Sequence, residues 1–559
     1  MSELTGGGHL AAALAAEGIT RVFGIPGTHN LEIFAQLSEH GIEIVSPRHE
    51  QGAGFMADGA ARVTGDVQVV VTTTGPAVLN ALTALLQSFT DSVPVLLISP
   101  GMPSTHPGRG TGLLHEVRSQ ALAIEAILGD SHRVTTVGEV PLAVAQALTR
   151  IRSGRPRPAS IEIPLDLIEA TGPGIIHPAV TRPLPVLDEQ GVATAAEALA
   201  ASQRPLVIAG GGSHGAGEGI VALAEALGAG IILSANAKGA IAGDHPLVLG
   251  ANGFLPELPD ILARADAVVA VGTELAPSDF WPVLLTLPDT VVRIDIDETQ
   301  MLGNAAVSHP LIADATEATA SLAAAVKRVR DHSGAEAVAS GGAAAPGSAV
   351  ERSAGGWPAE VVEIARAAAA RDGQPWAALS EGLTAFTQAA ESPVVIAADQ
   401  TMSCYYGVQT GWAARLGDRY LYPAGAGTLG FALPAAIGAK LADPAARVIA
   451  IEGDGGAMFT IPELAAAVQD EVSLALIIVD NGGYGEIRNE MADRGDVPTG
   501  VALRGPDFPA LASALGAHGV HVDGAEALTA ALTSAMERTG PTLIHLWEDS
   551  RASEDMLGR

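Results

Sequence analysis

Two motifs in the last third of the chain place oxygen ligands and glycines where predicted strands end. Gly453-Asp454-Gly455 follows the apolar run 448–451, and Asn481 follows the next such run. In open α/β sheets, ligands bind outside the carboxyl ends of the strands. Glycines allow backbone N–H groups to approach a phosphate, while Asp454, Asn481 and the carbonyl of Gly483 supply the oxygens that Mg²⁺ prefers. The spacing therefore predicts a binding site for a metal-bound diphosphate.

Two further segments fit a cofactor-binding role, although each also has a simpler explanation. Glu50 lies in the stretch 47–62 and opens a predicted helix, where its carboxylate could merely stabilise the positive end of the helix dipole. Leu429 stands between two glycines in 425–438, which otherwise has the composition of a glycine-rich turn before an alanine-rich helix. Composition explains the turn and the helix but not the leucine between the glycines.

Together these segments resemble the thiamine diphosphate-dependent enzymes of the acetolactate synthase and 2-oxo acid decarboxylase family. The pair formed by 453–455 and Asn481 is similar to the family's metal and diphosphate motif, which usually has Asn where this chain has Asp480. The resemblance implies thiamine diphosphate and Mg²⁺ as cofactors, with Asp454, Asn481 and Gly483 as metal ligands. It also implies that Glu50 is the general acid–base that activates the cofactor at N1′ of its aminopyrimidine.

The resemblance extends to loops on both sides of the expected cofactor. It implies that the Gly427 carbonyl accepts a hydrogen bond from the 4′-amino group and that Leu429 is the apolar wedge that bends the cofactor. The full set of residues implied to contact the cofactor is Pro26, Gly27, Gly75, Thr401, Gly427, Leu429, Gly453, Gly455, Gly456, Ala457, Asn481, Gly483, Tyr484 and Gly485. In the family, the first domain of one subunit faces the third domain of another, which implies a homodimer at least and commonly a homotetramer.

The cofactor motifs imply addition of a thiamine ylide to a 2-oxo acid, loss of carbon dioxide and an enamine whose fate they leave open. Protonation of the enamine gives a decarboxylase, and addition to a second carbonyl compound gives an acetolactate synthase-type carboligase. A catalytically silent paralogue is a further alternative. Segments 110–116 and 483–488 are most similar to 5-guanidino-2-oxopentanoate decarboxylases, so we predict a decarboxylase.

The same segments suggest residues that line the substrate pocket. His29 and His115 are predicted catalytic residues, as proton donors or carboxylate anchors. Thr28, Glu116 and Glu486 are tentative substrate contacts, because a guanidinium group pairs well with a carboxylate. Each of these residues also fits an ordinary role, as a hydrogen-bonded side chain or an exposed carboxylate.

The middle of the chain contains a weaker indication of a nucleotide-binding site. Gly210, Gly212 and Gly215 follow a predicted strand and satisfy a dinucleotide-binding pattern, which many glycine-rich strand–turn–helix segments meet. Acetolactate synthases hold FAD in this domain, but the Arg-Phe-Asp-Asp-Arg run typical of them is absent. We therefore predict no FAD.

Strand-like runs alternate with helical segments, which predicts an α/β fold of three doubly wound, parallel-sheet (Rossmann-like) domains. The predicted strands include 69–72, 95–99, 205–209, 267–271, 290–296, 394–398, 448–451 and 474–479, and the predicted helices 77–88, 432–441 and 461–468. The expected order is a pyrimidine-binding domain (1–170), a middle domain (190–330), a flexible linker (333–356) and a diphosphate-binding domain (357–547).

Bulk composition limits the partners. The chain has 559 residues and a formal net charge of −31, which argues against nucleic acid or an anionic membrane surface as a partner. Cys404 is the sole cysteine, so neither an internal disulfide nor a cysteine-type zinc site can form. No signal peptide or apolar run of membrane-spanning length is recognisable, so we expect a cytoplasmic enzyme that acts on a small-molecule 2-oxo acid.

Overall fold

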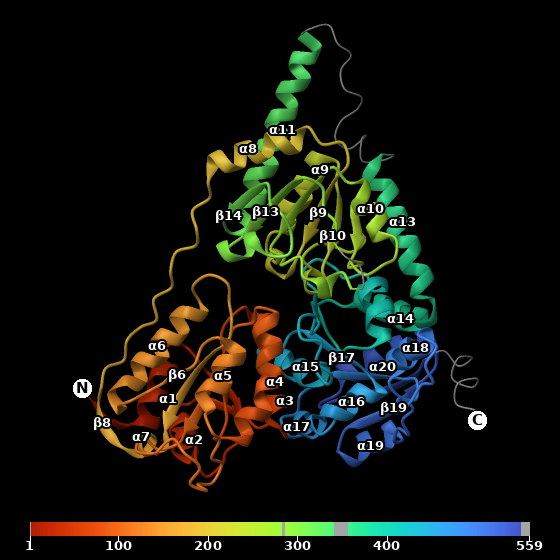
Figure 1. Cartoon of the computed structure of the whole chain (residues 1–559). Coiled ribbons are helices and arrows are strands. Elements are labelled where there is room, and N and C mark those ends of the chain that lie inside the picture. Colours follow the sequence, from red (N-terminus) through yellow and green to blue (C-terminus); the bar gives the residue numbers. More distant parts are fainter. Residues whose placement is uncertain (1, 282–284, 340–355, 549–559) are drawn as a thin grey trace.

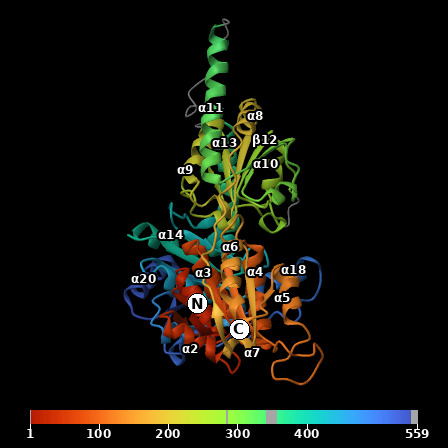
Figure 2. The ribbon, with the colours of Figure 1, turned by 90° about the vertical axis from the view of Figure 1, so that its left-hand side faces the viewer.

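The computed structural model describes residues 2–281, 285–339 and 356–548, which form three α/β domains (Figure 1). The first and third domains lie side by side at the base, and the middle domain sits above them, with helix α11 (Ala315–Ala339) projecting beyond it (Figure 2). Residues 333–339 of the expected linker thus continue α11, and 340–355 lie outside the described residues. No helix in the described ranges combines the length and apolar character that crossing a bilayer requires.

The first domain contains a six-stranded parallel sheet of order β3-β2-β4-β5-β7-β6. Its strands are β2 (Arg21–Gly24), β3 (Glu43–Val45), β4 (Gln68–Val71), β5 (Val95–Gly101), β6 (His132–Arg133) and β7 (Ala159–Pro164). Its helices are α1 (Gly6–Ala16), α2 (Leu31–Glu39), α3 (Glu50–Thr64), α4 (Pro76–Thr90), α5 (Gln120–Leu128), α6 (Val140–Ile151) and α7 (Leu165–Glu169). A short antiparallel pair, β1 (Ser2–Thr5) with β8 (Thr171–Gly174), extends the domain slightly past the predicted boundary at 170.

The middle sheet has the order β11-β10-β9-β12-β13-β14. Its strands are β9 (Pro205–Ala209), β10 (Gly230–Leu233), β11 (Val248–Gly250), β12 (Ala267–Val271), β13 (Thr290–Asp295) and β14 (His309–Ile312). Helices α8 (Glu189–Ala200), α9 (Gly217–Leu227), α10 (Leu258–Arg264) and α11 cover it, together with α13 (Trp357–Asp372). Val361 and Ala365 of α13 share a core with Leu206 and Ile232 of this sheet. The start of the third domain, expected at 357, therefore lies after α13.

The third sheet has the order β16-β15-β17-β18-β20-β19. Its strands are β15 (Val394–Ala398), β16 (Arg419–Leu421), β17 (Arg447–Gly453), β18 (Ala475–Asp480), β19 (His518–Val522) and β20 (Thr542–Trp547). Its helices are α14 (Ala377–Ala389), α15 (Ala432–Ala442), α16 (Asp454–Thr460), α17 (Glu463–Gln469), α18 (Gly485–Asp493), α19 (Phe508–Ala514) and α20 (Gly524–Glu537), with a π-helical turn at Ser403–Gln409.

The first and third sheets share one topology. In both, the second strand lies at the edge, followed by the first, third, fourth, sixth and fifth strands. The direction of winding reverses between the first and third strands of each sheet, and crevices that bind ligands form at the carboxyl ends of such strands. The pairs β2/β4 and β15/β17 therefore define the two edges at which the predicted site residues should lie.

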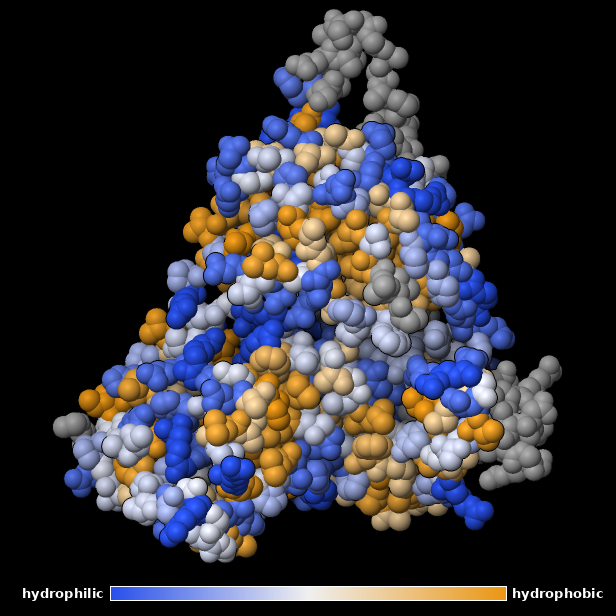
Figure 3. All heavy atoms as spheres, viewed as in Figure 1, coloured by the Kyte–Doolittle hydropathy of each residue, from blue (hydrophilic) through white to orange (hydrophobic). Residues whose placement is uncertain are grey.

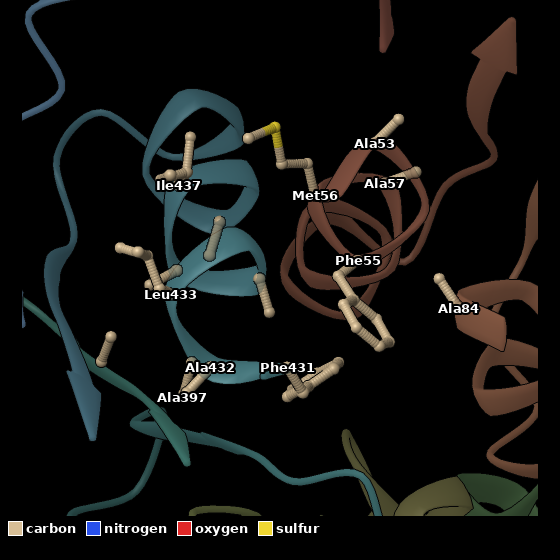
Figure 4. Close-up of a cluster of buried hydrophobic side chains, with 14 of the residues drawn as sticks. Ala53, Phe55, Met56, Ala57, Ala84, Ala397, Phe431, Ala432, Leu433 and Ile437 are labelled. Atoms are coloured by element: carbon tan, nitrogen blue, oxygen red, sulfur yellow. The ribbon is translucent and has the colours of Figure 1, made fainter. Parts of the chain in front are cut away.

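Helix α3 of the first domain packs directly on α15 of the third (Figure 4). A Cβ atom on Gly59 would lie 2.1 Å from a backbone carbonyl oxygen of α15, and one on Gly438 would lie 1.8 Å from the Met56 carbonyl oxygen. Only glycine allows the two backbones to approach so closely. Beside the crossing, Phe55 meets Phe431 edge-on, with 5.4 Å between ring centroids. The two domains consequently share one hydrophobic core.

The three domains meet around the buried side chain of Arg62. Its guanidinium pairs with Asp58 at 2.6 Å and with Asp91 at 2.7 Å, both in the first domain. It also donates to Asn236 Oδ1 of the middle domain at 3.0 Å and to the Tyr422 carbonyl of the third at 3.3 Å. A cavity of about 480 Å³ adjoins this junction, and hydrophilic residues border the hollow (Figure 3). One cation thus contacts all three domains.

Candidate active site

Asp454 and Asn481 lie side by side at the carboxyl edge of the third sheet. Strands β17 and β18 are parallel neighbours, with Gly453 opposite Val479, so the residues that follow them share this edge. The Asn481 N–H donates to Asp454 Oδ1 at 3.3 Å, while Asp454 Oδ2 and Asn481 Oδ1 are buried without a hydrogen-bond partner. Buried oxygens without partners are unfavourable unless a donor or a cation satisfies them. The residues present therefore fit a metal ion.

The electrostatics of this edge favour a hard cation. Burial, together with the nearby charge of Asp480, raises the pKa of Asp454 to about 7. A bound cation would reverse this effect, because it stabilises the ionised carboxylate. Within the described ranges, no group of three or more His, Cys, Asp and Glu side chains is placed to hold a metal. A metal here would depend on Asp454 and on amide and carbonyl oxygens, as Mg²⁺ sites do.

Glycines line this edge at points where a side chain would collide. A Cβ atom on Gly453 would lie 2.9 Å from Thr401 Oγ1, and one on Gly455 would lie 2.8 Å from the Tyr484 ring. Gly483 adopts φ 142°, and its carbonyl accepts the N–H of the residue two positions later at 3.1 Å. A cavity of about 520 Å³ opens over the edge and is lined by Asp454, Gly455, Met458, Phe459, Tyr484, Leu503, Arg504, Gly505 and Pro506.

The remaining residues predicted for the diphosphate end lie at the same edge. Gly456 abuts Asp399, whose Oδ2 would be 2.7 Å from an added Cβ atom. Ala457 is buried in α16, and Gly485 packs against the Asn481 side-chain amide. The structure thus brings together residues from the ends of β15, β17 and β18, as the strand order requires.

The segment before α15 is tied to the first domain of the same chain. Thr428 donates to Gln87 Oε1 of α4 from its hydroxyl at 3.0 Å. Gly427 and Gly430 adopt φ 63° and 73°, which favours glycine at both positions. Leu429 is half-buried between them. The turn therefore requires glycine at 427 and 430, and Leu429 is the large apolar residue between them.

Glu50 is the half-buried first residue of α3. Asn80 Nδ2 on α4 donates to Glu50 Oε2 at 3.0 Å. The turn before Glu50 is held by the third domain, because the Glu463 carboxylate accepts the N–H groups of Arg48 at 2.9 Å and His49 at 3.0 Å. Burial raises the pKa of Glu463 to about 7, and the nearby charge of Glu50 acts in the same direction.

No hydrogen bond or ion pair within the described part of a single chain joins Glu50 to Asp454 or Asn481. That the two edges form one cofactor site between two chains remains a prediction.

His29 and His115 meet at the carboxyl edge of the first sheet. His29 follows β2, and its Nδ1 lies 2.5 Å from Thr74 Oγ1. The two imidazole rings are in edge contact, with 5.2 Å between centroids. Burial, and secondarily His115, lowers the pKa of His29, which favours the neutral ring. His115 Nδ1 is buried without a partner, and the His115 carbonyl lies against Gly75. The structure thus brings the two predicted catalytic histidines together, and their catalytic role remains a prediction.

The other residues of the predicted pyrimidine loop follow β2. Pro26 and Thr28 are exposed and Gly27 is half-buried, with the Gly27 N–H donating to Asn30 Oδ1 at 2.7 Å. This hydrogen bond closes the loop and leaves the Thr28 side chain open to solvent.

Glu116 and Glu486, the two tentative substrate carboxylates, differ in how far their oxygens are already bonded. Glu116 accepts hydrogen bonds from its own loop and pairs with His106, so its oxygens are already engaged. Glu486, on the first turn of α18, is half-buried against Tyr405. Burial raises the pKa of Glu486, the nearby Glu490 adds to this, and the Tyr405 hydrogen bond opposes it. No ion pair of the described residues includes Glu486.

The glycine-rich turn of the middle domain is explained in part by packing. A Cβ atom on Gly210 would lie 2.3 Å from the Gly272 carbonyl oxygen, and one on Gly212 would lie 3.1 Å from Gly272 Cα. Two turns after neighbouring strands thus press against each other beside the three-domain cavity. This contact accounts for two of the three glycines, and the absence of FAD remains a prediction.

Comparison with known proteins agrees with this geometry over all three domains. The descriptions "Thiamine pyrophosphate enzyme, N-terminal TPP binding domain", "central domain" and "C-terminal TPP binding domain" match residues 4–122, 192–322 and 405–546. A probable 2-ketoarginine decarboxylase of Pseudomonas aeruginosa is 37% identical over 97% of this chain and 94% of its own length. The chain belongs to the thiamine pyrophosphate enzyme family. Acetolactate synthase isozyme 2 and isozyme 1 large subunits of Escherichia coli are each 28% identical, over 96% and 98% of this chain and 94% of their own lengths.

Two features of this thiamine pyrophosphate enzyme escaped prediction from the sequence. One is Glu463, which contacts Arg48 although 415 residues separate them, so no local pattern could reveal it. The other surrounds Asp480, whose Oδ1 accepts the Gly482 N–H at 2.9 Å and whose Oδ2 lies 3.2 Å from His545 Nε2. The departure from Asn at 480 was a visible signal, but its histidine partner was not.

Proposed function

We propose that this thiamine pyrophosphate enzyme decarboxylates a 2-oxo acid with thiamine diphosphate and Mg²⁺, and that its substrate is 5-guanidino-2-oxopentanoate, also called 2-ketoarginine. The proposal rests chiefly on similarity to a probable 2-ketoarginine decarboxylase along nearly the whole of both chains. Glu486 supports it, because a half-buried carboxylate near the metal edge with no cationic partner among the described residues suits a guanidinium group.

The proposed roles follow from the two edges. Asp454, Asn481 and the Gly483 carbonyl would hold Mg²⁺. Residues at the diphosphate end would be Thr401, Gly453, Gly455, Gly456, Ala457, Tyr484 and Gly485, and those at the pyrimidine end Pro26, Gly27, Gly75, Gly427 and Leu429. When bound, thiamine diphosphate supplies an electron sink for the pair released as carbon dioxide leaves. Glu50 holds and moves a proton at the pyrimidine ring, and His29 and His115 orient the substrate carboxylate and deliver a proton to the product.

Glu50→Gln tests the assignment of the proton-transfer residue. The amide keeps the size of the side chain but cannot exchange the proton, so we expect turnover to fall by about 10²–10⁴-fold while cofactor is retained. Carbon dioxide release and organic products would be measured with several 2-oxo acids, with the exposed Glu39→Gln as a control. An unimpaired rate in Glu50→Gln would reject the role.

Mixing two inactive variants tests the proposed assembly as a homodimer or homotetramer. If Glu50 of one chain serves the Asp454 edge of another, a heterodimer of Glu50→Gln and Asp454→Ala chains has one intact site. Random re-assembly should then restore about a quarter of the wild-type activity. If both residues served a site within one chain, no activity would return.

Glu486→Gln tests the guanidinium substrate. Losing a charge-assisted hydrogen bond of about 1.5–3 kcal/mol should raise KM for the cationic substrate by about 10–150-fold and leave neutral 2-oxo acids unaffected. Asp493→Asn, at the exposed end of the same helix, is the matched control. Equal effects on cationic and neutral substrates would remove Glu486 from the pocket.

A carboligase of acetolactate synthase type is the second candidate. It is favoured by the nearly full-length similarity to the two acetolactate synthase subunits of Escherichia coli. Acetolactate formed from pyruvate, in place of an aldehyde and carbon dioxide alone, would support this alternative over the decarboxylase.

A further inference from the structure

The loop between β5 and α5 is folded around one of its own carboxylates. This loop, drawn in orange beside α5 in Figure 2, contains Glu116. Glu116 Oε2 accepts the N–H groups of Thr111 and Gly112 at 2.8 Å each and of Leu113 at 3.2 Å. Oε1 lies 2.9 Å from His106 Nε2 and 3.1 Å from the Thr111 nitrogen. Three successive backbone donors therefore converge on one side chain.

These contacts leave Glu116 little capacity for a substrate. A carboxylate offers about four acceptor positions, and the Thr111 hydroxyl, at 3.2 Å from Oε2, adds to the donors already present. The backbone hydrogen bonds, that of Thr111 first, hold the pKa of Glu116 below its usual range, so the group stays ionised. A guanidinium group would have to displace the loop's own donors to reach it.

The residue next to Glu116 has a strained backbone. His115 adopts φ 61°, a left-handed conformation that residues other than glycine seldom adopt. Such a conformation persists only where the surroundings hold it. Its carbonyl oxygen would lie 2.3 Å from a Cβ atom on Gly75, so a close backbone contact fixes the other side of the turn. In this position the His115 ring lies against His29.

We propose that Glu116 is a positioning residue whose carboxylate folds the loop 106–116 so that His115 is held against His29 at the substrate pocket. The proposal rests on the proposed function, in which His115 acts on the substrate. It reassigns Glu116 from a tentative substrate contact to a group that acts through its neighbour.

Glu116→Gln is the direct test. An amide keeps one accepting oxygen but loses the negative charge and replaces the second oxygen with an NH₂ group, so the anchor of the loop is weakened with little change in volume. We expect kcat for the best 2-oxo acid substrate to fall about tenfold or more, with KM nearly unchanged. In a His115→Gln background, Glu116→Gln should have no further effect, because its action passes through His115. The matched control is Glu125→Gln on the exposed face of α5.

Two outcomes would overturn the proposal. A rise in KM confined to cationic substrates would make Glu116 a substrate ligand. An undiminished loss in the His115→Gln background would show that Glu116 does not act through His115.

A measurement that does not depend on catalytic activity tests this proposal separately from the proposed function. Hydrogen exchange at the amides of 111–113 should accelerate in Glu116→Gln and not in Glu125→Gln, and the His115 ring resonances should shift in the first variant only. Unchanged exchange and resonances would refute the loop anchor even if the enzyme is a decarboxylase. If the wild type releases no carbon dioxide from any 2-oxo acid, the proposed function fails. The exchange measurement still shows whether Glu116 anchors the loop.

Discussion

Glu463 should make the stability of the enzyme depend on pH in a predictable direction. Its side chain is 1% exposed, and burial raises its pKa from 4.5 to about 7. The folded protein therefore binds this proton more tightly than the unfolded chain does. The stability that follows is fully present below about pH 4.5 and is lost as the pH rises through 7, in total about 3 kcal/mol.

Glu463→Gln removes the titrating group but keeps one oxygen to accept the N–H groups of Arg48 and His49. Between pH 5 and pH 8.5 the wild type should therefore lose up to about 3 kcal/mol more stability than the variant. Urea midpoints of the two proteins at each pH would measure this difference, because a three-domain chain need not unfold in one step. Glu537→Gln, at an exposed site in the same domain, is the control.

The refuting result is a parallel decline of the wild type and Glu463→Gln across that range. Burial of the carboxyl would then not be the source of the pH dependence. A related change is more severe: Glu463→Ala leaves two backbone N–H groups without their acceptor, at about 1–3 kcal/mol each, and should also lower kcat by loosening the start of α3 at Glu50.

Three further outcomes are expected. Asp454→Ala removes one of two unpartnered buried oxygens, so Mg²⁺-dependent retention of thiamine diphosphate, followed by equilibrium dialysis, should weaken by about 100-fold or more; unchanged retention would contradict the metal seat. Gly438→Ala places a Cβ atom 1.8 Å from a backbone oxygen that cannot rotate away, so stability in urea should fall by about 3 kcal/mol or more. Gly303→Ala, where the nearest atom is 3.6 Å away, should be nearly neutral. His545→Asn breaks a buried contact to Asp480 and should cost about 3 kcal/mol while also weakening cofactor retention, and an unaltered melting temperature would show that the pair is dispensable.

The strands most accurately predicted from the sequence are those buried on both faces. The predicted strands 205–209, 267–271 and 394–398 coincide with β9, β12 and β15 at both ends. Central strands of a parallel sheet read as continuous apolar runs, so composition alone locates them. Because ligands bind at the carboxyl ends of parallel strands, the predicted strand ends also indicated correctly that Asp454 and Asn481 lie close together.

Contacts between distant parts of the chain could not be predicted in the same way. Helix α13 has the amphipathic pattern of any covering helix, and nothing in it specifies the middle sheet in place of the third. The carboxylates of Glu116 and Glu486 are chemically alike in the sequence. Only the backbone donors around the first and the tyrosine beside the second distinguish their proposed roles.

The glycine-mediated crossing of α3 and α15 bears on how relatives of this enzyme can be recombined. Because a core is common to the outer two domains, a chimera that exchanges only one of them would join surfaces that evolved apart. The middle domain has core clusters largely its own, together with α13, and makes a more suitable unit of exchange provided that Asn236 is kept for Arg62. We therefore expect the first and third domains to be exchanged together, both in evolution and in engineered chimeras.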